Sequence, residues 1–410
     1  MHSLVNRFKR NVRRLIFFVT NGQASLMSSD CAILSSAGAS MGIMNIDTTS
    51  CCDNMVDVIT CDDEFNIISI NWKDSGLSGR LDSGIFTLPE LKSLDLSDNN
   101  LKGQLSTFPG SLEVLNLSTN RLNGTMPTLP EALREFKIDN NFFTGILGEL
   151  PDSLENVDVS FTDLSGQLPL FPANIQTFNA STCDFTGQLP ELPESLTFLD
   201  VNSNNLMGTI PKLPSQLIEL SIWGNAFNST LPSLPISLQS LLAGDAGLYG
   251  KVGALPLNLE FLDLSDNDLS GNITIHRPHT FYIQYNSFNK IEVSDLSELG
   301  NCDISGNSVL NKDVAYLAKY CTANDLLDIL SPNPPVDSPT LDSNTSILNI
   351  VYGISYAVLG IAVLFGVFVI GVCVRDRFRD KTISKTKIPI PFRKNPFSKN
   401  DRVKSEALLR

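Results

Sequence analysis

The sequence has very few of the side chains on which most catalysis depends. Among its 410 residues there are three histidines, and no Ser/His/Asp set, Gly-rich phosphate loop or metal-binding motif occurs. His276 and His279 are three positions apart, but no further ligand residues cluster near them, so a metal pair is not expected. The sequence therefore predicts a protein that is not an enzyme and that uses no cofactor.

Positive charge is also scarce over most of the chain. The formal net charge is −14, from 30 Lys and Arg against 44 Asp and Glu. From Arg375 to the end there are twelve basic and four acidic residues, or +8, so the preceding residues carry −14 − 8 = −22. Phosphate binding requires a basic face, and the acidic body therefore argues against nucleic acid as a partner.

One long segment lacks charge altogether. Residues 350–374 are 25 uncharged residues, and about 20 apolar residues are enough to cross a bilayer as a helix. Four basic residues between Arg375 and Lys381 follow at once, which by the positive-inside rule places the C-terminus in the cytoplasm. We therefore expect a single-pass type I protein of the plasma membrane, with a transmembrane helix over residues 349–374 rather than a buried core helix. A basic cytoplasmic tail follows over residues 375–410, and its 36 residues are too few for a kinase domain.

The segments before this helix agree with an extracellular body. Residues 1–28 resemble a signal peptide with a short apolar core, although a mispredicted start or a disordered leader would look similar. Residues 331–348 are proline-rich and predict a stalk. Six Asn-X-Ser/Thr sequons all precede the helix and are candidate glycosylation sites. The sequons begin at Asn116, Asn123, Asn179, Asn228, Asn272 and Asn344.

The body is built from a repeat of 21 residues. An apolar residue recurs nine times at this period from Leu91 to Leu259, and we number the positions of each repeat from zero at this residue. Positions 3, 5 and 10 are apolar in phase with it, as in Leu94, Leu96 and Leu101. The apolar-x-apolar pair predicts one short strand per repeat, stacked in parallel with one face buried. With degenerate units at both ends, residues 67–310 contain about twelve repeats.

Three further positions carry the same residue in most repeats. Position 8 is usually Asn, whose amide can bond the backbone of adjacent coils and so form a ladder. Cys183 falls in this row, and we interpret it as a structural substitute rather than a reactive thiol. Position 12 is Gly in all but one repeat, where Ser229 replaces it, and position 18 is Pro. The glycines predict turns with positive φ, and the prolines exclude a long helix in the return segment.

These motifs resemble the plant-type leucine-rich-repeat family, whose unit is LxxLxLxxNxLxGxIP. The segments LKSLDLSDNNLKGQL and LTFLDVNSNNLMGTIP, which begin at Leu91 and Leu196, match it closely. The repeat length of 21 departs from the 24 usual in that family. The leading Pro-x-Ser-Leu, as in Pro193 to Leu196, is similar to the shorter bacterial-type repeat. The resemblance implies a leucine-rich-repeat solenoid with few helices, and together with the single transmembrane helix and the short tail it implies a receptor-like protein.

The resemblance also implies how the ends of the solenoid are closed. Residues 29–66 are similar to the paired-cysteine cap of this family, which implies the disulfides Cys31–Cys51 and Cys52–Cys61. Four cysteines allow three connectivities, so spacing alone leaves the pairing open. Residues 311–330 are expected to form a C-terminal cap, closed by Cys302 and Cys321; free buried thiols are the alternative.

Ligands are expected on the concave face of such a solenoid, where the strand residues that alternate with the buried pair point outward. These are positions 2, 4, 6 and 7, and they are rich in Asp and in exposed aromatic residues. Such a surface suits proteins, peptides, basic partners or glycans, while acidic residues that merely keep the solenoid soluble are the simpler interpretation of the Asp column. The candidate ligand-binding residues are Asp158, Phe161, Phe198, Asp200, Trp223, Phe261 and Asp263.

The sequence thus favours a cell-surface receptor-like protein that binds an extracellular protein, peptide or glycan and acts through partners. Asn395, Pro396 and Phe397 in the tail resemble a ligand of endocytic adaptor domains, and small residues within the membrane helix suit pairing with a co-receptor. A structural or adhesive surface protein and a membrane-held inhibitor of wall-degrading enzymes are the alternatives, because nothing in the repeats separates the three.

Overall fold

The computed structural model describes residues 29–43, 46–48, 51–55, 58–277, 279–295, 297, 299–307, 317, 320 and 321. Within these residues no helix has both the length and the apolar character needed to cross a membrane. The predicted signal peptide, stalk, transmembrane helix and cytoplasmic tail lie outside the described residues, and so do Asn344 and Asn395–397.

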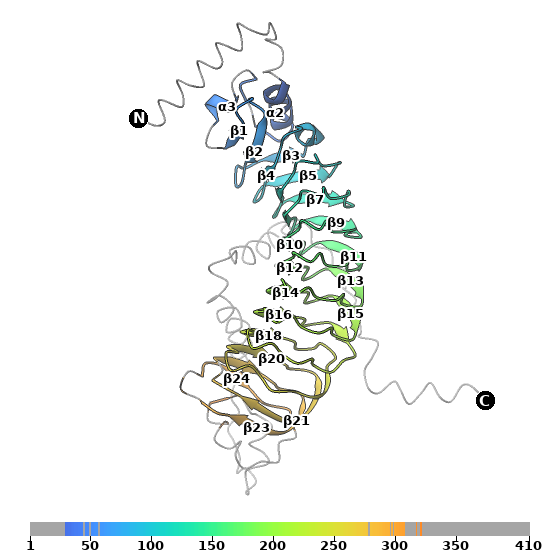
Figure 1. Cartoon of the computed structure of the whole chain (residues 1–410), viewed down its shortest axis with the longest axis vertical. Coiled ribbons are helices and arrows are strands. Elements are labelled where there is room, and N and C mark those ends of the chain that lie inside the picture. The colour runs from blue at the N-terminus through green and yellow to red at the C-terminus, as the bar shows by residue number, and fades with distance from the viewer. Residues whose placement is uncertain are drawn as a thin grey trace, which may run out of the picture. The chain divides into compact units, whose positions relative to one another are not determined.

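A sheet of 13 strands, which we call the long sheet, runs through every coil of the repeat region (Figure 1). Its first strand, β1 (Ile59–Cys61), is antiparallel to β2 (Ile67–Asn71), and the others are parallel and in register. The following strands are β4 (Ser93–Asp95), β6 (Val114–Asn116), β8 (Glu135–Lys137), β10 (Asn156–Asp158), β12 (Thr177–Asn179), β14 (Phe198–Asp200), β16 (Glu219–Ser221), β18 (Ser240–Leu242), β20 (Phe261–Asp263), β22 (Thr280–Tyr282) and β24 (Cys302–Asp303).

The apolar rows of the repeat form the core of this stack. Leu94 in β4 pairs with Leu115 in β6, which pairs with Phe136 in β8, and all three are fully buried. The second residue of each apolar pair, such as Leu96, is also buried but lies just after its strand has ended. The short parallel strand predicted at the apolar pair of each repeat is therefore confirmed.

A second set of strands, which the sequence did not reveal, lies on another side of the coils. We call it the side sheet; it comprises an eight-stranded parallel sheet and a three-stranded parallel sheet. Its strands occupy the segment around the position-12 glycines, where we expected only a turn. They are β3 (Ser78–Arg80), β5 (Asn100–Gln104), β7 (Arg121–Gly124), β9 (Phe142–Gly145), β11 (Asp163–Gln167), β13 (Asp184–Gly187), β15 (Asn205–Gly208), β17 (Ala226–Phe227), β19 (Tyr249–Lys251), β21 (Asp268–Ile275) and β23 (Ser287–Val293).

The asparagine ladder joins successive coils as predicted. Nδ2 of Asn204 donates to the carbonyls of Ala180 and Val201 at 2.8 and 3.1 Å, and its Oδ1 accepts from the Phe185 amide at 2.9 Å. At the Cys183 position the sulfur makes the equivalent contact to the Val159 carbonyl at 3.4 Å. Burial raises the pKa of the Cys183 thiol, which keeps it protonated and supports a structural role.

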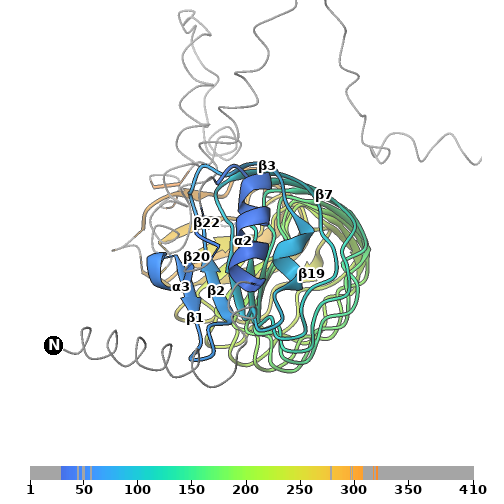
Figure 2. The ribbon, with the colours of Figure 1, turned by 90° about the horizontal axis from the view of Figure 1, so that it is seen from above.

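Two helices and a short 3₁₀ turn close the N-terminal end of the stack. Helix α2 (Ser29–Ser40) lies across the end of the coils in Figure 2, and the Ser78 amide of β3 donates to the Met41 carbonyl just beyond it. Helix α3 (Cys51–Asn54) and the 3₁₀ helix η1 (Ser83–Thr87) complete this region. The predicted disulfides Cys31–Cys51 and Cys52–Cys61 are confirmed, and so is Cys302–Cys321 at the other end.

Candidate ligand-binding face

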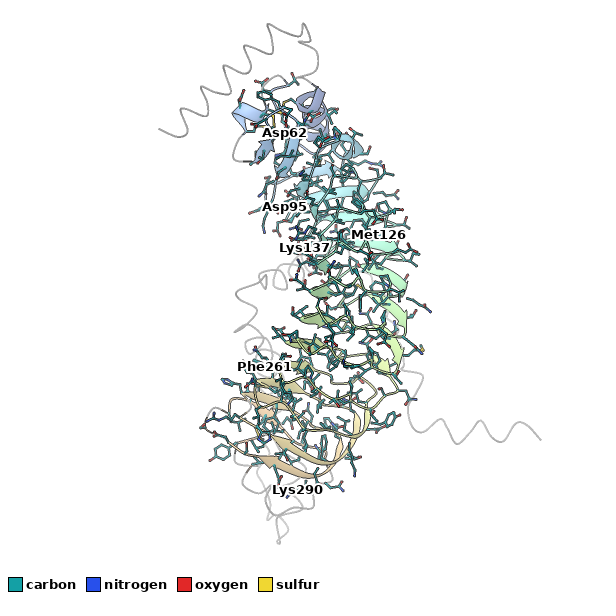
Figure 3. All side chains as sticks on the ribbon, in the orientation of Figure 1. Asp62, Asp95, Met126, Lys137, Phe261 and Lys290 are labelled. Atoms are coloured by element: carbon teal, nitrogen blue, oxygen red, sulfur yellow. A yellow bond between two sulfur atoms is a disulfide. The ribbon has the colours of Figure 1, made fainter. Side chains whose placement is uncertain are left out.

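We define the concave face as repeat positions 2 and 4, which lie in the strands of the long sheet, together with positions 6 and 7 beyond each strand. In Figure 1 the long sheet lines the inner side of the described coils, and Figure 3 places Asp95, Lys137 and Phe261 on that side, with Met126 on the opposite one. Parallel pairing in register aligns equivalent residues of successive coils. Each repeat position therefore forms a column along the face.

The Asp and Asn residues at position 4 have a structural role. Each accepts a hydrogen bond from the backbone amide two residues later, as Asp263 does from Ser265 at 2.9 Å and Asn179 does from Ser181 at 3.1 Å. This turn ends the strand and directs the chain into the ladder, and short carboxylates and amides are suited to it. The predicted binding residues Asp158, Asp200 and Asp263 are accordingly half-buried, with one oxygen engaged in the turn.

Asp158 is the most perturbed acid of this column. Desolvation by burial, together with repulsion from Asp139 on the preceding coil, raises its pKa from 3.8 to about 7. Ser160 donates to its Oδ1 from both the backbone amide and the hydroxyl, at 3.0 and 2.6 Å, and Asn179 donates to Oδ2 at 3.1 Å. These donors stabilise the carboxylate but do not outweigh its burial. Burial likewise raises the pKa values of Asp200 and Glu219.

Position 6 was predicted to be exposed, and in several coils it is not. Ser97, Ser160, Ser181 and Ser265 are all buried. Their side chains are short, and that of Ser265 donates its hydroxyl to Asp263, two residues earlier in the same coil, at 2.6 Å. Trp223 at the same position, in contrast, has 43% of its surface exposed.

Besides Trp223, the concave face has two further exposed aromatic rings. Phe161 is 45% exposed and Tyr285 is 58% exposed, whereas the predicted Phe198 and Phe261 are half-buried. Tyr282 and Tyr285 were missed because the repeat before theirs is two residues short, which shifts the phase of the pattern. The nearby Ile283, Asn286 and Phe288 nevertheless mark its phase, so counting from that Asn would have placed Tyr285 at position 7.

Position 7 has a left-handed backbone in every described coil of the face. Asp98 has φ of 57°, Phe161 51° and Tyr285 54°, and the two glycines of the column, Gly224 and Gly306, have 64° and 65°. This conformation costs a residue with a side chain roughly 1–2 kcal/mol, and Gly, Asn and Asp tolerate it best. Phe161 and Tyr285 therefore combine an unfavourable backbone with an exposed aromatic ring.

Trp223 lies against the next coil at a place where a side chain is missing. A Cβ built on Gly244 would come within 2.8 Å of Trp223 Cδ1 and within 2.9 Å of an oxygen of Asp263. Gly244 does not have a positive φ. A glycine is therefore required here because a side chain would not fit, and not because of the backbone conformation. The absence of a side chain at Gly244 thus allows the indole to approach the Asp263 carboxylate.

Negative charge on the face is uncompensated in its C-terminal half. From Phe198 to Gly306 the described outward positions carry acids and no Lys or Arg, whereas further back Lys73 pairs with Asp98 at 3.3 Å and Lys137 with Glu135 at 2.6 Å. Burial raises the pKa of Asp266, and repulsion from nearby acids raises it further. Burial, then Asp263 and Asp303, also raise the pKa of the Tyr282 hydroxyl. The acids of this half are Asp200, Glu219, Asp245, Asp263, Asp266 and Asp303.

Comparison with known proteins agrees with this architecture. The Leucine Rich Repeat family model matches residues 90–112, 111–133, 195–217 and 258–276. The matched segments are coils of the solenoid, and they are similar to leucine-rich repeats. No curated protein sequence matches the chain.

Several solved structures are similar to it. The plant peptide hormone receptor RGFR1 in complex with RGF2 is 27% identical, with a TM-score of 0.48, over 57% of this chain and 42% of that one. A structure of PEPR1 with AtPEP1 is 22% identical, with a TM-score of 0.48, over 67% and 52%. YopM from Yersinia enterocolitica WA-314 is 26% identical, with a TM-score of 0.44, over 59% and 61%. The chain thus spans about half the length of the two receptor structures.

Proposed function

We propose that the chain is a cell-surface receptor-like protein whose concave face binds a cationic peptide or a basic segment of a protein. The observation that carries this proposal is the pair Phe161 and Tyr285. Both rings are exposed, and both stand on a left-handed backbone where Gly224 and Gly306 occupy the same position of other coils. Such a residue lowers the stability of the coil and exposes apolar area, so a ligand that covers the ring accounts for its presence.

The charge of the face supports a cationic ligand. Six acids and no described Lys or Arg face outward between Phe198 and Gly306, and the aromatic rings of Trp223 and Tyr285 stand among them. Lys and Arg side chains interact favourably both with carboxylates and with the faces of aromatic rings. A neutral glycan would stack on the rings and donate its hydroxyls to the acids, but it would leave their charge uncompensated, so we favour the peptide.

The remainder of the proposal rests on the sequence. The uncharged residues 349–374 would anchor the protein as a single transmembrane helix, with the repeats outside the cell and the basic tail inside. A co-receptor would pair with this helix, and an endocytic adaptor would recognise Asn395, Pro396 and Phe397 in the tail. The protein would therefore act through partners rather than by catalysis.

The decisive experiment is a screen of the detergent-purified full chain against a displayed library of random peptides. We expect enrichment of sequences rich in Arg and Lys, and at least tenfold weaker binding of the selected peptides to Trp223→Ala and Tyr285→Asn variants. Phe142→Asn is the matched control, because Phe142 is 52% exposed but lies on the side sheet. The proposal would be refuted if peptides were enriched regardless of their charge, or if Phe142→Asn weakened peptide binding as much as the two test variants do.

A further inference from the structure

The asparagines of five sequons lie within the described residues, and they divide between the two sheets. Asn116 and Asn179 end strands β6 and β12 of the long sheet and belong to the concave face. Asn123 lies in β7, Asn272 lies in β21, and Asn228 directly follows β17, all in the side-sheet region. From the sequence all of them are equal candidates for glycosylation, but their surroundings differ.

The side-sheet asparagines project freely into solvent. Asn123, Asn228 and Asn272 are exposed, and within the described part of the chain none of their side-chain amides takes part in a hydrogen bond. The hydroxyl residues of the same sequons are exposed as well. They are Thr125, Thr230 and Thr274. A sugar on Nδ2 at these positions therefore displaces no neighbour and breaks no contact.

The concave-face asparagines are held by the fold. Oδ1 of Asn179 accepts from the Ser181 amide at 3.1 Å, and its Nδ2 donates to Asp158 Oδ2 at 3.1 Å. Nδ2 is the atom to which a glycan is attached, so a sugar there would crowd the contact with Asp158, which is already poorly solvated. Oδ1 of Asn116 accepts from the Ser118 amide at 3.1 Å.

The hydroxyl residues of these two sequons are engaged too. Ser181 is buried, and the hydroxyl of Ser118 donates to Asp139. Both sequons therefore belong to the turns that end strands of the long sheet. Asn116 and Asn179 are themselves half-buried, so a glycan on either Nδ2 would crowd the residues around the turn.

The disulfides supply an independent reason to expect glycans at all. Cys31–Cys51, Cys52–Cys61 and Cys302–Cys321 form in oxidising compartments, and chains that fold on the secretory route meet both disulfide formation and N-glycosylation there. This reason does not depend on which ligand the protein binds.

We propose that the folded protein carries N-glycans on its side sheet, at Asn123, Asn228 and Asn272. Asn116 and Asn179 on the concave face stay unmodified. In the transfer, Nδ2 bonds to C1 of a sugar, the bond from C1 to the diphosphate of a lipid-linked oligosaccharide donor breaks, and the amide proton leaves with the released lipid diphosphate. The sugars cover the side sheet and leave the concave face open to a ligand.

The test is a site-by-site measurement on the full chain produced in human cells. Folded protein is digested and treated with peptide-N-glycosidase F in heavy-oxygen water, which converts each glycosylated Asn to labelled Asp. We expect label at Asn123, Asn228 and Asn272 and none at Asn116 or Asn179. Label at either concave-face site, or its absence from any side-sheet site, overturns the proposal. Asn344 gives a separate peptide and does not enter the count.

A pair of variants checks the assignment by gel mobility. The double variant Asn116→Asp and Asn179→Asp keeps an acceptor oxygen for each turn, as Asp263 has in the same column, and should migrate like the parent. The triple variant Asn123→Asp, Asn228→Asp and Asn272→Asp should lose the mass of three glycans. Because the peptide measurement is made on the parent protein, it tests the proposal even where a variant fails to fold.

Discussion

Trp223 is placed by Gly244: the indole lies where a side chain on the next coil would otherwise stand, with Cδ1 within 2.8 Å of the Cβ that Gly244 lacks. The same missing Cβ would approach Ser265 Oγ to 2.7 Å. One glycine thus sets how an exposed ring meets the acids of the neighbouring coil. The effect of adding a single methyl group at Gly244 can be measured directly.

We expect Gly244→Ala to move the indole away from the coil of Asp263. The methyl group has no room at 2.7 to 2.9 Å from three atoms, so Trp223 must change rotamer or the coils must separate. The variant should lose about 1–3 kcal/mol of stability, the usual range for overpacking. Its tryptophan emission should shift, and peptide binding should weaken. Gly253→Ala is the control, since nothing lies within 4 Å of its Cβ, and unchanged emission in Gly244→Ala would contradict the placement.

Substitutions at the left-handed positions Phe161 and Tyr285 should change stability and ligand binding in opposite directions. Phe161→Asn and Tyr285→Asn replace an aromatic residue with one that tolerates φ near 50°, as Asn140 does in the same column. Each should raise the free energy of unfolding by roughly 0.5–1 kcal/mol, a part of the cost of the left-handed backbone. Each should also weaken ligand binding. Thermal melts and titrations on the same samples test this, and a loss of stability in both variants would argue against backbone strain.

Stability should depend on the protonation of Asp158. Its folded-state pKa of about 7 lies above the ordinary 3.8, so the folded protein binds this proton more tightly than the unfolded chain does. The resulting stabilisation is complete below about pH 4 and is lost as the pH rises through 7. Asp158→Asn should therefore be about 1–2 kcal/mol more stable than the parent at pH 8, within the limit set by about 1.4 kcal/mol per pKa unit.

The advantage of Asp158→Asn should disappear toward pH 4. Asn fits this position because Asn116 and Asn179 make the same turn in the same column. Glu149→Gln, on an exposed loop residue, is the control and should change stability little at either pH. Urea unfolding at both pH values measures the effect, and an equal difference at pH 4 and pH 8 would rule out titration of Asp158 as its cause.

The ladder predicts that Cys183→Asn stabilises the protein. The sulfur reaches the Val159 and Ser181 carbonyls at 3.4 and 3.6 Å, while the Asn204 amide makes equivalent bonds at 2.8 and 3.1 Å. A properly formed hydrogen bond adds about 1 kcal/mol, and we expect a gain of that size. Asn204→Ala should lose about 2–3 kcal/mol, because it leaves buried carbonyls and the Phe185 amide without a partner. A loss of stability in Cys183→Asn would contradict this prediction and would show that the residues around Cys183 accommodate a thiol better than an amide.

The coils could be predicted because their signal is repeated and local. The apolar positions of Leu94 and Leu96 recur in phase over nine repeats, and a stack of coils buries both rows. The side sheet could not, because a strand such as β5 offers only Leu101 as a buried residue. Its extended conformation comes from hydrogen bonds between coils, and the sequence pattern of a single coil does not contain them.

The concave face was predicted in outline, and its chemistry only in part. Phe161 and Trp223 were correctly expected to be exposed, because an aromatic ring at those positions has no interior to enter. The left-handed backbone of Phe161 escaped notice, since glycine is the usual sign of it and only two coils show one there. The structural role of Asp158 could not be predicted either, because an Asp that forms a turn and an Asp that binds a ligand look the same in the sequence.

Parallel stacking places equivalent residues of the concave face at a regular spacing along the solenoid. Phe161 follows β10 and Tyr285 follows β22, six strands further along the long sheet. With strands about 4.8 Å apart, the two rings are separated by roughly 29 Å along the stack. An extended peptide advances about 3.3 Å per residue, so one that touches both rings must be about nine residues long. The spacing of the strands differs from the rise per residue of the peptide. Successive peptide residues therefore do not stay in register with the coils, and only some of them can lie opposite an acid.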